Sequence, residues 1–190
     1  MLAGGSTPAA VYRWLAVSAA NWNRWLIYFG DERCLPPEHP DRNSVMVAKA
    51  WLNQVAIPAA NIHLIPAERG PQLGADAYGP LVQQARPFDL VLLGMGEDGH
   101  TASLFPGQCY DPDQPVHPVR NAPKPPADRI SLSLAALNDA RQVIILITGS
   151  GKHEAIQRWR NGEALPVTQV HGHAGAKVYV DALAYTGSEK

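Results

Sequence analysis

Short apolar runs alternate with amphipathic stretches along the whole chain, and this alternation restricts the fold more than any other feature. The runs that favour buried strands are residues 25–29, 62–65, 90–93, 143–147 and 178–180. The stretches with helical periodicity are residues 8–17, 44–54, 73–85 and 152–160. In the third of these, Gly79-Pro80 is expected to kink or divide the helix. The order predicts the α/β class, with a mostly parallel sheet covered by helices on both faces.

One soluble domain over residues 1–190 accounts for the length and composition. Of the 190 residues 46% are hydrophobic, which allows one sizeable core. The formal charge of −1 is untypical of a nucleic-acid-binding protein, so no nucleic acid partner is expected. No apolar run reaches the roughly 18 to 20 residues that cross a bilayer, and the first residues are untypical of a secretion signal. We therefore expect no membrane partner and a cytoplasmic location.

The segment from Pro106 to Asp128 interrupts the alternation. It is rich in proline and has little apolar periodicity. The segment is expected to form a long surface loop inside the domain, and such loops often carry functional residues.

A titratable cluster directly follows the apolar run at residues 88–93. The next fourteen residues are Gly-Met-Gly-Glu-Asp-Gly-His-Thr-Ala-Ser-Leu-Phe-Pro-Gly, and they contain Asp98 and His100. Open α/β sheets bind ligands at the carboxyl ends of their strands, and imidazole can exchange a proton near neutral pH. The loop therefore predicts a catalytic site. Alternatively, Asp98-Gly99 is an ordinary hairpin turn.

A glycine-rich turn lies near the start of the chain. Residues 1–3 are expected to end a strand, and Gly4, Gly5, Ser6 and Thr7 lead into the helix that follows. Ser6 or Thr7 is expected to cap this helix, with Pro8 in its first turn. Free backbone N–H groups at a helix start bind phosphate, although an ordinary strand-to-helix turn would have the same sequence.

A second glycine-rich turn, Thr-Gly-Ser-Gly-Lys at residues 148–152, follows the apolar run at 143–147. It places Lys152 in the first turn of a helix, where the helix dipole disfavours a cation unless an anion is bound nearby. The spacing is too short for a P-loop, so a nucleotide triphosphatase is excluded. The alternative is a solvated lysine at a helix end.

Two further positions carry charges beside expected strands. Arg129 begins an alternating segment at residues 129–134 and could hold a phosphate bidentately, although it could also be a solvated charge at a strand edge. Asp31, Glu32 and Arg33 follow the apolar run at 25–29. A local surface salt bridge would explain this second group equally well.

Together these residues resemble the 6-phosphogluconolactonases, a family related to the glucosamine-6-phosphate deaminases. The resemblance runs in family order through most of the chain, and the fourteen residues around His100 are its most specific part. The matching segments are residues 4–8, 31–33, 39–44, 94–107, 129–133 and 148–152.

The resemblance implies a modified Rossmann-type sheet and the hydrolysis of 6-phospho-D-glucono-1,5-lactone in the oxidative pentose phosphate pathway. His100 would be the general base, Asp98 would orient it, and Asp31 would contact sugar hydroxyls. Arg33 would hold substrate or stabilise negative charge on the carbonyl oxygen. The groups that would bind the phosphate are Gly4, Gly5, Ser6, Thr7, Arg129 and Lys152. The partner is the small sugar phosphate lactone; no cofactor or metal is implied, and the expected state is a monomer or weak homo-oligomer.

The family pattern includes one strand and one helix before Gly4 that this sequence does not contain, so we expect an N-terminally truncated sheet. One alternative activity is that of a glucosamine-6-phosphate deaminase or isomerase. Those relatives carry a glutamate where this chain has Phe105, and a tyrosine where it has Arg33. Another alternative is a sugar-phosphate-binding regulator that has lost catalysis.

Overall fold

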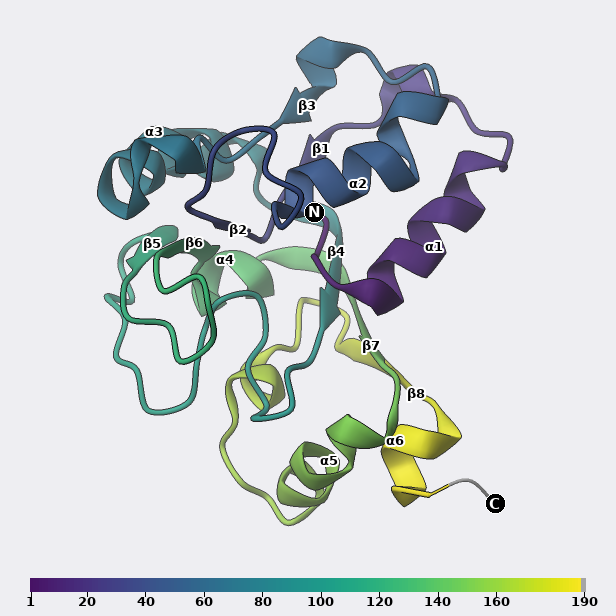
Figure 1. Cartoon of the computed structure of the whole chain (residues 1–190), viewed down its shortest axis with the longest axis vertical. Coiled ribbons are helices and arrows are strands. Elements are labelled where there is room, and N and C mark those ends of the chain that lie inside the picture. Colours follow the sequence, from purple (N-terminus) through teal and green to yellow (C-terminus); the bar gives the residue numbers. More distant parts are fainter. Residues whose placement is uncertain (189–190) are drawn as a thin grey trace.

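The structure is a computed structural model of the chain and describes residues 1–188. Parallel strands form its centre (Figure 1). One pair has the order β1-β3 and the other parallel sheet has the order β4-β7-β8. The strands are β1 (Ile27–Tyr28), β3 (Ile62–His63), β4 (Phe88–Gly94), β7 (Ala140–Ile147) and β8 (Ala176–Val180).

Residues 1–3 join these two groups of strands into one surface. The Leu2 N–H donates to the Tyr28 carbonyl at 2.7 Å, and the Gly30 N–H donates to Leu2 at 2.9 Å. On the other side, the Leu92 N–H donates to the Met1 carbonyl at 3.1 Å. The segment therefore lies between β1 and β4, and the mostly parallel α/β class predicted from the sequence is confirmed.

A second sheet is antiparallel, and the sequence pattern did not predict it. Its order is β2-β6-β5, with β2 at Asp31–Arg33, β5 at Val116–Val119 and β6 at Arg129–Leu132. The expectation of an unbroken loop over residues 106–128 was wrong, because β5 lies within it. This strand contains Pro118 and alternates weakly, yet it pairs with β6 and packs beneath a helix.

The helices and short 3-10 turns fill the connections between strands. The helices are α1 (Ser6–Ala16), α2 (Asn43–Ala50), α3 (Pro71–Ala85), α4 (Leu134–Asn138), α5 (His153–Arg160) and α6 (Ala182–Thr186). The 3-10 turns are η1 (Trp22–Arg24), η2 (Leu52–Gln54), η3 (Ala59–Asn61), η4 (Ala67–Arg69), η5 (Ser150–Lys152) and η6 (Pro166–Gln169). Helices α1 and α4 both pack against β7, and α3 packs against β5 and β6 (Figure 1).

Two local expectations about the helices were wrong, and a third was wrong in part. Helix α3 continues through Pro80, so Gly79-Pro80 does not divide it. The helix expected over 44–54 ends at Ala50, and a 3-10 turn follows it. Helix α1 begins at Ser6 with Gly5 as its N-cap and no capping side chain, so neither Ser6 nor Thr7 caps it.

The core lies where the parallel strands meet the helices. Val91 and Leu93 of β4 and Val143 and Ile145 of β7 have no exposed surface. Burying each such side chain contributes about 1.5 to 3 kcal/mol, so these strands hold their carboxyl ends in fixed positions. No helix within residues 1–188 has both the length and the apolar character that crossing a bilayer requires.

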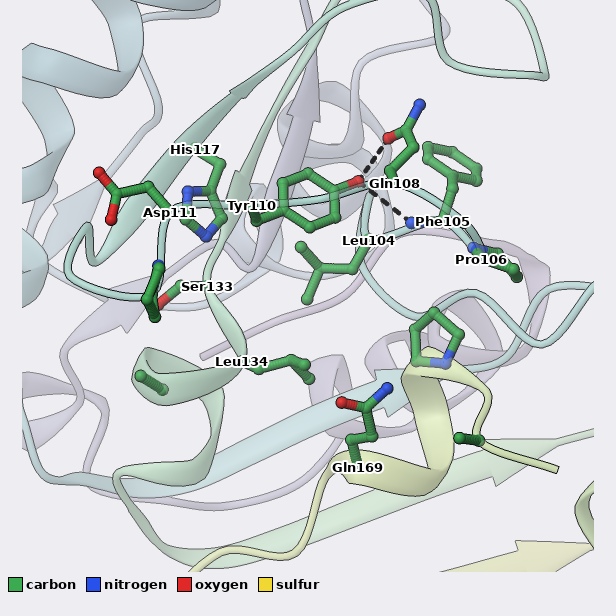
Figure 2. A pocket seen from close by; sticks show the side chains of 15 residues that line it. Leu104, Phe105, Pro106, Gln108, Tyr110, Asp111, His117, Ser133, Leu134 and Gln169 are labelled. Carbon is green, nitrogen blue, oxygen red and sulfur yellow. Dashed lines mark hydrogen bonds between the residues drawn. The ribbon is translucent and has the colours of Figure 1, made fainter. Parts of the chain in front are cut away.

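The loop at residues 94–107 separates two cavities. Residues from its first part, including Gly96 and His100, line a cavity of about 230 Å³ at the carboxyl ends of β4 and β7. Residues from its last part, including Leu104 and Phe105, line a cavity of about 290 Å³ (Figure 2).

Candidate functional site

The cavity at the strand ends collects the residues that the sequence singled out. All of the predicted site residues except Asp98 line it, and Asp98 contacts the His100 ring without lining the cavity itself. Strand β4 delivers the loop with His100, β7 delivers the turn with Lys152, and the segment before α1 delivers Gly4, Gly5, Ser6 and Thr7. This arrangement follows from parallel strands, whose carboxyl ends all meet at one edge.

His100 is held by a carboxylate. Its Nδ1 lies 2.5 Å from Oδ1 of Asp98, and the same oxygen accepts the His100 backbone N–H at 3.1 Å. A hydrogen on Nδ1 satisfies this contact and leaves Nε2 as the nitrogen able to accept a proton. Burial alone would raise the pKa of Asp98, but the hydrogen bond and charge of His100 outweigh burial and hold this pKa far below its usual value. Asp98 is therefore an anion at neutral pH.

Glycine is required where the imidazole lies over the loop. A Cβ atom on Gly96 would fall 2.0 Å from Nδ1 of His100. Gly99 has a φ of 85°, in the left-handed region that favours glycine. The alternative interpretation of Asp98-Gly99 as a hairpin turn was wrong, because the loop contains only an isolated bridge between Thr101 and Leu104.

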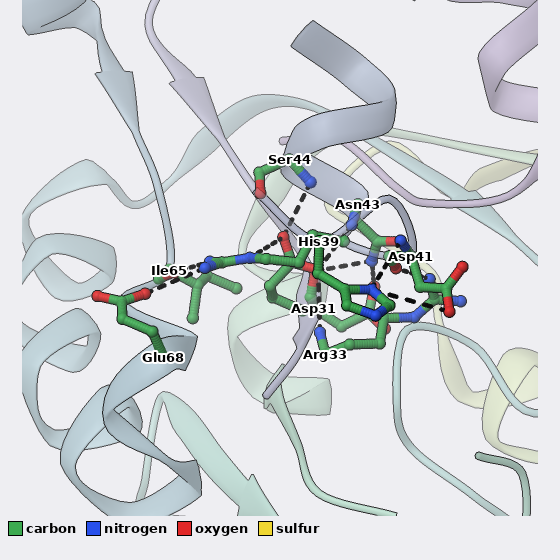
Figure 3. A network of polar contacts seen from close by, with 10 residues as sticks. Asp31, Arg33, His39, Asp41, Asn43, Ser44, Ile65 and Glu68 are labelled. Carbon is green, nitrogen blue, oxygen red and sulfur yellow. Dashed lines mark hydrogen bonds and ion pairs between the residues drawn. The ribbon is translucent and has the colours of Figure 1, made fainter. Parts of the chain in front are cut away.

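Asp31 faces the same cavity and is 6% exposed. Its Oδ1 accepts a hydrogen bond from the Asn43 amide at 3.0 Å, and its Oδ2 accepts one from the Ser103 hydroxyl at 2.7 Å. Figure 3 shows Asn43 above Asp31 in this network. Both carboxylate oxygens are thus fixed in place by two side chains whose role the sequence analysis missed.

Glu32 has a structural role beside the site. It is 1% exposed, accepts the backbone N–H groups of Asn43 and Ser44 at 2.6 and 2.8 Å, and lies 3.4 Å from Nε of Arg42. The interpretation of residues 31–33 as a local surface salt bridge was therefore wrong. Glu32 instead caps α2 and pairs with a buried arginine from that helix start, which keeps Asn43 over Asp31 (Figure 3).

Arg33 points away from Glu32 and towards the cavity. Its Nη1 donates to the Asp41 carbonyl, and its Nε is buried without a partner among residues 1–188. Nε has almost no accessible surface, so a ligand in the cavity would meet the outer nitrogens of the guanidinium, which suit an acceptor oxygen.

A hydrogen bond joins the two glycine-rich turns. The hydroxyls of Thr7 and Thr148 lie 2.6 Å apart. In the part of the chain that the structure describes, the backbone N–H groups of Ser6, Thr7, Ser150 and Gly151 have no hydrogen-bond partner. The Gly149 N–H is not free, because it donates to both carboxylate oxygens of Asp181. Two helix starts therefore converge with donors that an anion could accept.

Arg129 and Lys124 complete the cationic wall. Arg129 is 5% exposed and donates through Nε and Nη2 to the carbonyls of Lys124, Pro125 and Pro126. It is not a solvated charge, and its Nη1 has no partner within residues 1–188. These three bonds fix the proline-rich segment so that Lys124 lines the cavity. The sequence analysis missed Lys124, although its position shortly before Arg129 in a proline-rich segment was a usable signal.

The charges around the cavity favour an anion. Arg33, Lys124, Arg129 and Lys152 line it, whereas Asp31 is the one carboxylate among the described lining residues. Burial lowers the pKa of Lys152 and the charge of Glu97 partly restores it. Lys152 is half-buried and lines the cavity. A dianionic phosphate would compensate the mutual repulsion of these cations.

The sequence matches one described protein family over most of its length. The profile described as glucosamine-6-phosphate isomerases/6-phosphogluconolactonase matches residues 1–179. The chain is 37% identical over 165 residues to a 6-phosphogluconolactonase from a Nostoc species, covering 82% of this chain and 68% of that protein. It is 38% identical over 166 residues to a 6-phosphogluconolactonase from a Synechocystis species, with the same two coverages.

Solved structures give the same result for the fold. The crystal structure of 6-phosphogluconolactonase from Thermotoga maritima superposes with a TM-score of 0.89 at 30% sequence identity. The match covers 94% of this chain and 83% of that one.

Proposed function

The chain belongs to the family of glucosamine-6-phosphate isomerases and 6-phosphogluconolactonases, and we propose that it hydrolyses 6-phospho-D-glucono-1,5-lactone to 6-phosphogluconate, a step of the oxidative pentose phosphate pathway. One observation carries the assignment. The His100–Asp98 pair lies in the same small cavity as two converging glycine-rich turns and four cationic side chains. A general base beside a phosphate-sized anion site matches a phosphorylated ester substrate.

His100 acts as the general base. Nε2 takes a proton from water while the water oxygen bonds to the lactone carbonyl carbon. The bond between that carbon and the ring oxygen then breaks, and the ring oxygen takes the proton back from Nε2. Asp98 keeps the proton on Nδ1 and stabilises the imidazolium that forms between the two steps.

Two charged groups position the sugar and the developing charge. Asp31, held by Asn43 and Ser103, accepts hydrogen bonds from sugar hydroxyls. Arg33 supplies donors to the carbonyl oxygen as it becomes negative. A lactone is reactive enough that positioning, one base and charge stabilisation suffice, so the mechanism needs neither a metal nor another cofactor.

The 6-phosphate binds where the two glycine-rich turns meet. Gly4 and Gly5 allow close approach of the backbone, and the N–H groups of Ser6 and Thr7 donate to the phosphate oxygens. Lys152 and Nη1 of Arg129 neutralise its charge, and Lys124, whose ammonium is paired with Glu97 at 3.1 Å, adds a third cation.

The residue beside His100 argues against the deaminase reaction. The Phe105 ring lies 4.6 Å from the imidazole between ring centroids, and Phe105 is 2% exposed. An isomerisation of the sugar carbon skeleton needs a further proton-transferring group, and an aromatic ring cannot supply one. The lactone hydrolysis is therefore the better chemical match.

The test compares product formation from 6-phosphogluconolactone and from glucosamine-6-phosphate, with spontaneous lactone opening subtracted. We expect hydrolysis of the lactone and no deamination. His100→Asn keeps hydrogen-bonding capacity but cannot act as a base, so kcat should fall by about 100- to 10,000-fold while KM changes little.

A matched control is His171→Asn, which changes an exposed histidine outside the cavity and should leave kcat unchanged. Deamination of glucosamine-6-phosphate would contradict the assignment. Binding of 6-phosphogluconate without turnover of either substrate would instead identify a regulator that has lost catalysis. A near wild-type kcat in His100→Asn would show that another residue is the general base.

A further inference from the structure

The cavity of about 290 Å³ on the other side of the catalytic loop has no role in the proposed reaction (Figure 2). Its volume lies just below the range for drug-sized small-molecule sites, about 300 to 1,000 Å³, so any occupant is small. Leu104 and Phe105 of the loop form one wall, and Leu134 and Pro166 form the facing side. The walls are therefore mainly apolar, as those of small-molecule sites usually are.

His117 lines this cavity, and its ring nitrogens are accessible from it. It is 4% exposed, and its ring nitrogens have no hydrogen-bond partner within residues 1–188. The ring stacks on Tyr110, with centroids 5.0 Å apart and an angle of 26° between planes. Figure 2 shows both rings along one edge of the cavity, beside Asp111 and Ser133.

The state of His117 defines what it can offer a ligand. Burial lowers the pKa of His117, and the charge of Asp111 opposes this effect more weakly. The ring is therefore neutral near pH 7, with one nitrogen that donates and one that accepts. A ligand with an acceptor and a donor at matching positions would pair with both nitrogens.

The charged side chains that line this cavity differ from those that line the cavity around His100. No lysine or arginine is among the described residues that line this cavity, and Asp111 is its one carboxylate. An anion that entered would lose its hydration shell without gaining a cation. The cavity therefore does not suit a second sugar phosphate.

We propose that this cavity is a binding site for a small uncharged aromatic molecule that carries both a hydrogen-bond donor and an acceptor. The aromatic part packs against Leu104, Leu134 and the proline walls, and the polar part pairs with His117. Because the Phe105 ring also packs on His100, an occupant would contact the catalytic loop from behind.

The experiment uses two probes of equal shape and different charge, benzamide and benzoate. Each is titrated into the whole isotope-labelled chain while backbone and histidine-ring NMR signals are recorded. We expect saturable benzamide shifts at Phe105, Tyr110 and His117. Benzoate should bind at least about tenfold more weakly, because its charge has no partner in the cavity.

Two variants and one control variant show where benzamide binds. Ala135 is exposed and lines the cavity, so Ala135→Phe should block benzamide without disturbing the core, whereas Ala10→Phe on the exposed face of α1 should leave binding unchanged. His117→Phe keeps a ring but removes both polar nitrogens, and should weaken benzamide by about three- to tenfold.

Three results would overturn the proposal: no saturable benzamide shifts at these residues, equal affinities for benzamide and benzoate, or wild-type affinity in Ala135→Phe. The first two are measured on the wild-type chain, so the test does not depend on whether His117→Phe folds. Failure of lactone hydrolysis would not affect the result, because binding is read without substrate.

Discussion

At the scale of single residues, one oxygen atom does much of the positioning around the proposed base. Oδ1 of Asp98 accepts both the side-chain and the backbone hydrogen of His100, so it fixes the ring and the loop together. Gly96 has no side chain, and this allows the His100 ring to lie against the loop, because a Cβ on residue 96 would occupy the place of the imidazole. The Asp98 carboxylate and the absence of a Cβ on Gly96 together determine where Nε2 of His100 lies.

The depressed pKa of Asp98 predicts how this pair affects stability as pH changes. The folded-state pKa lies below the ordinary value of 3.8, so the ionised carboxylate stabilises the fold above that pH and loses this effect as pH falls towards the folded value. Asp98→Asn removes the contribution. The loss of Tm in this variant relative to wild type should therefore be largest near neutral pH and should shrink below about pH 4.

Thermal unfolding followed by circular dichroism across this range tests the sign. Asp113→Asn serves as the control, since Asp113 is an exposed acid whose carboxylate makes no hydrogen bond among residues 1–188. Its effect on Tm should be small at every pH. A Tm loss in Asp98→Asn that grows on acidification would contradict the inferred direction.

At the scale of elements, the phosphate site depends on neighbouring strands that end at the same level. Residues 1–3 pair with β1 and contact β4, while β4 pairs with β7. The turns that follow residues 1–3 and β7 consequently meet, and Thr7 bonds to Thr148. Helices α1 and α5 then direct their starts to one place, although their sequences lie far apart.

Replacing Lys152 by alanine should have a different effect from replacing Arg129 by alanine. The Lys152 side chain makes no hydrogen bond to the described chain, whereas Arg129 holds a neighbouring segment in place. Lys152 lies at the start of α5 and has no hydrogen bond from its side chain within residues 1–188. Lys152→Ala should weaken kcat/KM for 6-phosphogluconolactone by about 1.5 to 3 kcal/mol, the value of a hydrogen bond to a charged group. Unphosphorylated gluconolactone should be little affected.

Arg129→Ala provides the contrast. This change removes three bonds to the carbonyls of residues 124–126, so it should lower Tm and reduce the turnover of both lactones as well as phosphate affinity. Steady-state kinetics on the two lactones separates the cases. Equal losses on both substrates in Lys152→Ala would place that lysine outside the phosphate site.

At the scale of the whole molecule, the distribution of charge is more informative than its sum. The formal charge is −1, yet four cations line the cavity at the strand ends and none of the described lining residues of the other cavity is a lysine or arginine. A local field of this kind attracts an anionic substrate even when the protein as a whole is nearly neutral.

This field predicts a dependence on salt. Raising the NaCl concentration from about 0.02 to 0.5 M shortens the screening length to a few ångströms, so kcat/KM for 6-phosphogluconolactone should fall by about three- to tenfold. The same change should leave kcat/KM for uncharged gluconolactone nearly constant. Equal salt sensitivity for the two substrates, measured at fixed pH, would argue against electrostatic recognition of the phosphate.

The sequence by itself determined the order of the parallel strands and the longer helices, and it singled out most of the residues that line the cavity at the strand ends. Runs such as residues 90–93 must be buried, and Gly4, Gly5 and the glycines around His100 mark close backbone approach, so both signals are local. Parallel strands then bring their carboxyl ends together whatever their exact order. His100 and Lys152 follow such strands, whereas Arg129 begins a strand of the antiparallel sheet and was assigned to the site by the family resemblance.

Only the tertiary structure decided which groups support that site. Ser103 holds Asp31 from 72 residues away, Lys124 reaches the cavity because Arg129 binds three carbonyls, and β5 exists because β6 offers it an edge. The contact between Ser103 and Asp31 leaves no periodic or compositional trace, and for Lys124 the proline-rich segment was the one signal. These contacts depend on which strands are neighbours and on their register, and these are set by packing of the whole chain rather than by any local segment.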